Sequence, residues 1–144
     1  MHAPSINFLA VIVAAIVIWV LGALWYSKAL FATKWMALQG RTEEQMRADA
    51  AGANMGLLLV QAFICSLLIA LVLSMVLTHF HDDTGAYGGV HGAMAGFLAW
   101  LGFAGATSYA TNLFSSRPRQ LWLIDSGYNL VSFVLAGIIL AVWR

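Results

Sequence analysis

Long runs of apolar residues dominate the chain, and only a few polar segments interrupt them. Four runs cover residues 6–26, 55–77, 90–112 and 121–143. Each is close to the roughly 20 residues that an α-helix needs to cross a hydrocarbon layer about 30 Å thick. None shows the polar and apolar alternation of a half-buried strand. The pattern therefore predicts four membrane-spanning helices, and the glycine-rich third run is the weakest of them.

Composition supports a membrane protein. Hydrophobic residues make up 62% of the chain and charged residues 9%, whereas soluble domains carry roughly 25% charged residues. A soluble fold of 144 residues cannot hide so much apolar surface. We therefore predict one all-α membrane domain over residues 1–144, in which short connections join an antiparallel bundle of four helices. The expected partners are the lipid bilayer and bound lipids, and a net charge of +1 gives no reason to expect nucleic acid.

The basic residues are distributed unevenly between the two ends of the predicted helices. Only Arg144 lies at the end that holds both termini, and the first run has no basic residue before it, unlike a cleavable signal peptide. Because basic loops stay in the cytoplasm, we expect both termini on the outer side of a bacterial inner membrane. The basic residues on the expected cytoplasmic side are Lys28, Lys34, Arg41, Arg47, Arg117 and Arg119.

The segment of residues 27–54 is long for a connection between two spans. Trp25, Tyr26 and Trp35 are suited to the headgroup layer, where aromatic side chains gather. Thr42 and Gln45 have the spacing of a capping box at the start of a helix. We expect an interfacial helix followed by a charged cytoplasmic helix. A solvated connector is the plain interpretation, and a surface that binds a partner or senses lipid is the alternative.

Three glycines recur at four-residue spacing where the third run begins: Gly88, Gly92 and Gly96. On a helix they form one smooth groove that another backbone can approach closely. We expect this groove to pack within the bundle, rather than between two copies. Four helices enclose little interior, so a homo-oligomer or a place in a larger membrane complex is also expected.

The fourth run carries polar residues on one helix face, beginning with Asp125 and Asn129. A carboxylate at this depth faces protein or a water-filled crevice rather than lipid. The favoured interpretation is a structural clamp, in which Asp125 bonds the polar end of the third span. The alternative is a site for a polar substrate, ion or proton. The candidate residues are Asp125, Tyr128, Asn129, Ser108, Thr111 and Asn112.

The second run has a weaker polar line, formed by Gln61 and Cys65 four residues apart. We expect Gln61 to hydrogen-bond to a neighbouring helix. Cys65 is the only cysteine, so the chain can form no internal disulfide. We expect it to be a small residue of the core.

Histidines and aspartates gather between the second and third runs. Imidazole with carboxylate suits Zn²⁺, and imidazole with a nearby methionine suits copper. The pattern is short and has no second half with diagnostic spacing, so a plain polar loop is favoured over a metal or redox site, or a pH sensor. No cofactor is otherwise expected. The candidate ligands are His79, His81, His91, Asp82 and Asp83.

The chain contains no nucleophile elbow, P-loop, dinucleotide fingerprint or His-Glu-x-x-His motif, so we expect no enzymatic activity. The first function hypothesis is a structural or accessory subunit that packs with other membrane proteins or with itself. The second is a small oligomeric transporter or channel with its polar site around Asp125. The third is a metal or redox protein that uses the histidines of the outer face.

Three short motifs resemble a known family. They are Gly22-Ala-Leu-Trp25-Tyr26, Trp100-Leu-Gly-Phe103 and Ile124-Asp125-Ser-Gly127-Tyr128. Together with the flanking apolar segments, they make the chain similar to small bacterial membrane proteins that carry domain of unknown function 1761. The resemblance covers most of the chain and implies a multi-span integral protein with no activity to carry over. It favours Asp125 over the histidines as the residue with a shared role.

Overall fold

A computed structural model describes residues 5–79 and 88–143 of the chain, and these residues form helices and short connections with no strand among them. The expectation of an all-helical protein is therefore confirmed for the described residues. Residues 89–114 form one continuous helix, because a π-helical segment joins α5 to α6. The elements are α1 (Phe8–Trp25), α2 (Ala32–Leu38), α3 (Glu43–Gly52), α4 (Met55–His79), α5 (Gly89–Ala99), η1 (Trp100–Gly105), α6 (Ala106–Phe114) and α7 (Arg119–Val142).

Four helices are long and apolar enough to cross a membrane: α1, α4, the continuous helix of residues 89–114, and α7. Local chemistry sets two of their starting points. The side chain of Asn7 accepts hydrogen bonds from the backbone N–H groups of Leu9 and Ala10, so α1 begins at Phe8. Pro118 precedes the first residue of α7, where its fixed φ suits entry into a helix.

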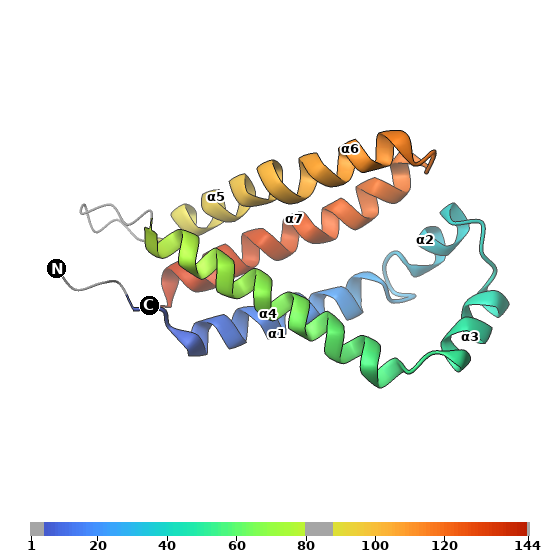
Figure 1. Cartoon of the computed structure of the whole chain (residues 1–144), viewed down its shortest axis with the longest axis horizontal. Coiled ribbons are helices and arrows are strands. Elements are labelled where there is room, and N and C mark those ends of the chain that lie inside the picture. The colour runs from blue at the N-terminus through green and yellow to red at the C-terminus, as the bar shows by residue number, and fades with distance from the viewer. Residues whose placement is uncertain (1–4, 80–87, 144) are drawn as a thin grey trace.

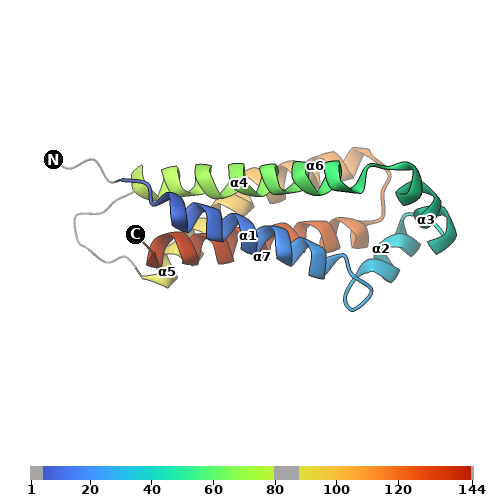
Figure 2. The same ribbon diagram turned by 90° about the horizontal axis from the view of Figure 1, so that it is seen from below.

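The long helices lie side by side and alternate in direction along the chain (Figure 1). The start of α1 and the end of α7 lie at one end of the molecule, where the Asn7 side-chain amide donates a 3.4 Å hydrogen bond to the Trp143 carbonyl. Helices α2 and α3 lie at the opposite end, here called the connector end, as both Figure 1 and Figure 2 show. Helix α7 contacts each of α1, α4 and α5 and is thus the central helix.

The core between α1, α4 and α7 is made mainly of small and aliphatic side chains. Ile18 is the largest hydrophobic side chain that is almost fully buried. Because alanine leaves little bulk between two backbones, its use here lets the helices approach closely. The buried residues of this core are Ala10, Val11, Ala14, Ala15, Ile18, Ala70, Leu73, Leu77, Ala136 and Leu140.

Helices α5 and α7 touch through their backbones. A Cβ atom added to Gly92 would lie 2.1 Å from the Gly137 carbonyl oxygen, and one added to Gly96 would lie 2.2 Å from the Phe133 carbonyl oxygen. Two of the three glycines singled out in the sequence thus stand at this contact. Gly88 does not, because it precedes α5 and nothing lies within 4 Å of its Cβ position. The partner glycine on α7, Gly137, was not anticipated.

The expectation for Cys65 was wrong, and the one for Gln61 is not met within this chain. Cys65 is exposed on α4 rather than part of the core. Gln61 is exposed as well, and within the described part of the chain its side chain makes no hydrogen bond. Helix α4 is apolar on all sides, so its sequence does not mark which side faces inward. The buried side is formed by Ser66, Ala70, Leu73, Ser74 and Leu77.

Candidate polar site around Asp125

Asp125 lies near the start of α7 and is partly buried at the connector end. Its Oδ1 atom accepts two hydrogen bonds, one from the Tyr26 hydroxyl at 2.8 Å and one from the Trp35 indole N–H at 3.0 Å. Tyr26 directly follows α1, and Trp35 belongs to α2. The carboxylate therefore fastens the end of α1 and helix α2 to α7. Its expected partners on α6 make no hydrogen bond with it in the described part of the chain.

Tyr26 is adapted to this contact. Burial raises the pKa of its hydroxyl above the ordinary value, and the hydrogen bond to Asp125 raises the pKa further. A phenol with the ordinary pKa of about 10 is already protonated at neutral pH, and the raised pKa keeps it a donor to the carboxylate at higher pH as well. The rings of Tyr26 and Trp35 also meet edge to face, with their centroids 5.5 Å apart. Both donors are thus held in place by each other as well as by Asp125.

Two of the sequence motifs interlock beside this carboxylate. A Cβ at Gly22 would lie 3.1 Å from the Tyr128 hydroxyl oxygen, and a Cβ at Gly127 would lie 3.3 Å from the Trp25 ring. Each glycine therefore leaves room for the aromatic side chain of the other motif. The two aromatic side chains also donate hydrogen bonds across the contact, from the Trp25 indole to the Ile124 carbonyl at 3.0 Å and from Tyr128 to a backbone carbonyl of α1 at 3.2 Å.

The third motif reaches the same stretch of α7 from the other side. The Trp100 indole N–H donates a 3.1 Å hydrogen bond to the Ser126 carbonyl. Trp100 opens the π-helical segment, and a Cβ on Gly105 would lie 3.1 Å from its ring. Such segments are rare and often stand at functional positions in helices. The indole groups of Trp25 and Trp100 consequently hold backbone carbonyls on both sides of Asp125.

A groove of about 400 Å³ lies between α6 and α7 and includes Asp125. The Trp122 indole N–H spans the two helices by donating a 3.0 Å hydrogen bond to the Ser108 hydroxyl. Ser126 also lines the groove, and its hydroxyl is buried without a hydrogen-bond partner among the described residues. The lining residues are Ser108, Thr111, Asn112, Ser115, Arg117, Leu121, Trp122, Asp125, Ser126 and Asn129.

Most of the polar residues singled out in the sequence thus share one groove. Tyr128 is the exception, because its hydroxyl points to the backbone carbonyl of Ile18 on α1. The sequence also gave no indication that Tyr26 and Trp35 bind Asp125, since aromatic residues near a span end are typical headgroup anchors. The one signal in the sequence that Tyr26 has a role of its own was its position within a family motif; Trp35 belongs to none of the three motifs.

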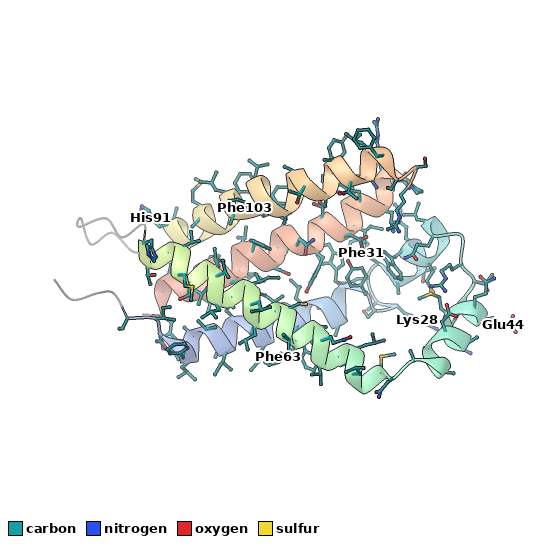
Figure 3. The ribbon with its side chains drawn as sticks, in the orientation of Figure 1. Lys28, Phe31, Glu44, Phe63, His91 and Phe103 are labelled. Atoms are coloured by element: carbon teal, nitrogen blue, oxygen red, sulfur yellow. The ribbon has the colours of Figure 1, made fainter. Side chains whose placement is uncertain are left out.

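The two described histidines, His79 and His91, lie at the end of the molecule opposite Asp125. His79 ends α4, where its Nδ1 atom lies 2.9 Å from the Met75 carbonyl oxygen, and His91 is exposed on the first turn of α5 (Figure 3). The other candidate ligands, His81, Asp82 and Asp83, lie outside the described residues. Within the described ranges, no three His, Cys, Asp or Glu side chains are grouped closely enough to hold a metal ion. The predicted metal site therefore stays a prediction.

The helices and the groove define an all-helical protein with four membrane-compatible helices and a polar site at one end. The chain belongs to the family described as "Protein of unknown function (DUF1761)", whose match extends over residues 9–141. The resemblance drawn from the three motifs is therefore confirmed. The chain matches no curated protein and no solved structure.

Proposed function

We propose that this chain is a non-enzymatic integral membrane protein that packs, through the outer face of α4, with a second copy or with another membrane protein. The observation that supports this most directly is the exposed and unpartnered side chain of Gln61. A primary amide that faces hydrocarbon without a hydrogen bond costs several kcal/mol, on the order of other unsatisfied polar groups in lipid. A neighbouring helix that accepts and donates hydrogen bonds removes this cost.

The surroundings of Gln61 suit a helix partner. Gln61, Cys65, Leu68, Val72 and Met75 follow one another at spacings of four and three, so they lie on one face of α4, and all five are exposed. The spacing is that of the contact positions of two helices that cross at a small angle. Cys65 is small enough to let the partner backbone approach one turn after Gln61.

The arrangement of the helices supports the expected orientation in a bacterial inner membrane. Lys28, Lys34, Arg41 and Arg47 lie in or beside the connector. Arg117 lies between α6 and α7 at the same end, and Arg119 begins α7. By the positive-inside rule, this end faces the cytoplasm, and both termini lie on the outer side. Helix α2 would then lie in the inner headgroup layer.

Transport or channel activity around Asp125 is a weaker proposal. It needs a continuous polar path, whereas the interior between α1, α4 and α7 is filled by side chains such as Ala14, Ile18 and Ala136. Such a path would have to form between several copies of the chain. A metal or redox role for the outer histidines likewise has no support from the described residues.

Disulfide cross-linking of Cys65 in native membranes tests the packing proposal. In a dimer with a two-fold axis along the membrane normal, equivalent residues meet at equal depth, and Cys65 would pair with its counterpart. We expect a mild oxidant to produce a covalent dimer, and we expect the yield of this dimer to be lower for Gln61→Leu than for wild type. The matched control is the Cys65→Ser protein carrying Ser66→Cys, whose cysteine faces the core and should not cross-link.

A different partner gives a different result. If α4 binds another membrane protein, the wild-type chain will not form the disulfide dimer but will co-purify with that protein in mild detergent. The Gln61→Leu variant will then no longer co-purify with it. Absence of both the dimer and a co-purifying membrane protein contradicts the packing proposal. Equal yields for wild type and Gln61→Leu contradict the role assigned to the amide.

A further inference from the structure

The groove between α6 and α7 offers an acidic group that lacks a basic partner. Both hydrogen bonds to Asp125 come from neutral donors, the Tyr26 hydroxyl and the Trp35 indole, and both reach the same oxygen atom. Among the described residues, no lysine or arginine forms an ion pair with Asp125. A carboxylate accepts about four hydrogen bonds, so Asp125 retains capacity for a cationic donor.

The same groove offers a cation and free hydrogen-bonding groups. Arg117 lines the groove and forms no ion pair with any described residue. The hydroxyl of Ser126 is without a partner even though the residue is only 3% exposed. Buried hydroxyl groups are nearly always hydrogen-bonded, so the Ser126 hydroxyl has the capacity to pair with a group that enters the groove. The Ser132 hydroxyl, which does not line the groove, also lacks a partner among the described residues. Asn112 and Asn129 add amides that both donate and accept.

We propose that this groove binds a zwitterionic group consisting of a primary ammonium and a phosphate, as in phosphoethanolamine. The ammonium is placed at Asp125, with Ser126 and Asn129 beside it, and the phosphate is placed at Arg117. One carboxylate and one guanidinium in the lining give the groove no net charge, which fits a ligand that carries one charge of each sign. The groove volume of about 400 Å³ falls in the usual range for small-ligand sites.

The position of the groove favours a lipid headgroup as the source of this ligand. Asp125 lies about one and a half turns into α7, a depth near the boundary between headgroups and hydrocarbon. A second hollow, of about 280 Å³, adjoins the groove and shares Trp122 with it. Its other lining residues are Tyr109, Leu123 and the charged Arg119. The site is separate from the α4 face, so it does not depend on the packing proposal.

Native mass spectrometry of the full chain, loaded with defined lipids in detergent, tests the inference. Three lipids with the same acyl chains are compared: phosphatidylethanolamine, phosphatidylcholine, whose quaternary amine has no N–H donor, and phosphatidylglycerol, which has no cation. We expect phosphatidylethanolamine to be retained best. Asp125→Asn should weaken its retention roughly ten- to a hundredfold, the factor that corresponds to a hydrogen bond with a charged group.

Controls separate ligand binding from folding. Asp125→Asn keeps an oxygen that accepts from Tyr26 and Trp35 but loses the charge, so it should lower the thermal stability in detergent less than Asp125→Leu, which removes the acceptor. Lipid retention is therefore compared at a temperature at which wild type and Asp125→Asn are both folded. Tyr26→Phe removes one bond of the clamp but keeps the carboxylate, and should retain the lipid. Ser126→Ala should weaken lipid retention without lowering the stability of the lipid-free protein, because its hydroxyl has no partner there.

A second arm of the experiment identifies the source of the group. Soluble glycerophosphoethanolamine, a phosphodiester with one charge of each sign, is titrated into the delipidated protein and binding is followed by calorimetry. Binding of the soluble compound without selective lipid retention would support the zwitterion site and assign it to a free metabolite. Equal retention of the three lipids together with no binding of glycerophosphoethanolamine would overturn the inference. A preference for phosphatidylglycerol, or Asp125→Asn retaining phosphatidylethanolamine fully, would overturn it as well.

Discussion

The close contact between α5 and α7 requires glycine at position 92, and the addition of one methyl group there tests this requirement. In Gly92→Ala, the new Cβ would lie 2.1 Å from the Gly137 carbonyl oxygen and 2.6 Å from the Ala141 Cβ atom. Ordinary van der Waals contact begins at about 3.4 Å. The obstacles are a backbone carbonyl and a methyl group on a helix, neither of which can rotate away. The two helices must therefore move apart along this contact.

The expected cost follows from this rigidity. Overpacking in a well-packed interior costs about 1–3 kcal/mol, and the upper end of that range applies where no flexible side chain can yield. We therefore expect Gly92→Ala to lower the free energy of unfolding by about 3 kcal/mol. At about 1.4 kcal/mol for each factor of ten, this is a decrease of roughly a hundredfold in the folding equilibrium constant.

Reversible unfolding in mixed micelles, with increasing mole fractions of sodium dodecyl sulfate, measures this change. Gly102→Ala is the matched control: it lies in the same long helix, and nothing lies within 4 Å of its Cβ position. We expect it to raise the free energy of unfolding by about 0.5–1 kcal/mol, because alanine replaces glycine inside a helix without a new contact. If Gly92→Ala and Gly102→Ala unfold at the same mole fraction, the close contact between α5 and α7 does not exist.

Three further predictions concern the connector end. Tyr26→Phe removes a hydrogen bond to a charged group and should lower the free energy of unfolding by about 1.5–3 kcal/mol, and Trp35→Phe should lower it by a comparable amount. Both substitutions should accelerate amide hydrogen exchange in α2. Thr42→Ala breaks the capping box observed at the start of α3, costs about 1 kcal/mol, and should accelerate exchange in α3 while leaving α2 unchanged. The hydrogen bond from Lys28 lowers the pKa of Glu43, with the charges of Lys28 and Arg47 adding to it. Because the pKa of Glu43 is lowered on folding, the stability that Glu43 contributes is present above pH 4.5, its ordinary pKa, and is lost as the pH falls through the lowered pKa. An NMR titration of the Glu43 carboxyl checks the cause, since Lys28→Gln should raise this pKa toward 4.5.

The sequence predicted those features that depend on local chemistry. Long apolar runs marked the four long helices, because a helix that crosses lipid needs about 20 apolar residues. The spacing of Thr42 and Gln45 predicted the capping box, and both of its hydrogen bonds are present. The short helix around Trp35 was also expected and corresponds to α2.

The contacts between helices were harder to predict. Soluble helices show their inner face by an apolar stripe, but α4 is apolar all round, and so Gln61 and Cys65 were assigned to the wrong side. Asp125 was singled out correctly as a partly buried carboxylate of a long helix, yet its partners Tyr26 and Trp35 lie 99 and 90 residues away in the sequence. Hydrogen bonds between residues so far apart in the chain produce no local pattern in the sequence.

The same separation has a consequence for biosynthesis. Tyr26 and Trp35 leave the ribosome 99 and 90 residues before Asp125. Because the ribosome adds about 5–20 residues per second, Asp125 is synthesised on the order of 5–20 s after these two donors. During that interval α2 has no hydrogen bond to the rest of the chain through Trp35, and α1 and α4 are without the helix that contacts them both. Arrival of α7 therefore supplies these contacts together, and a chain that stalls before residue 125 should leave the segment around α2 more sensitive to proteases than it is in the full chain.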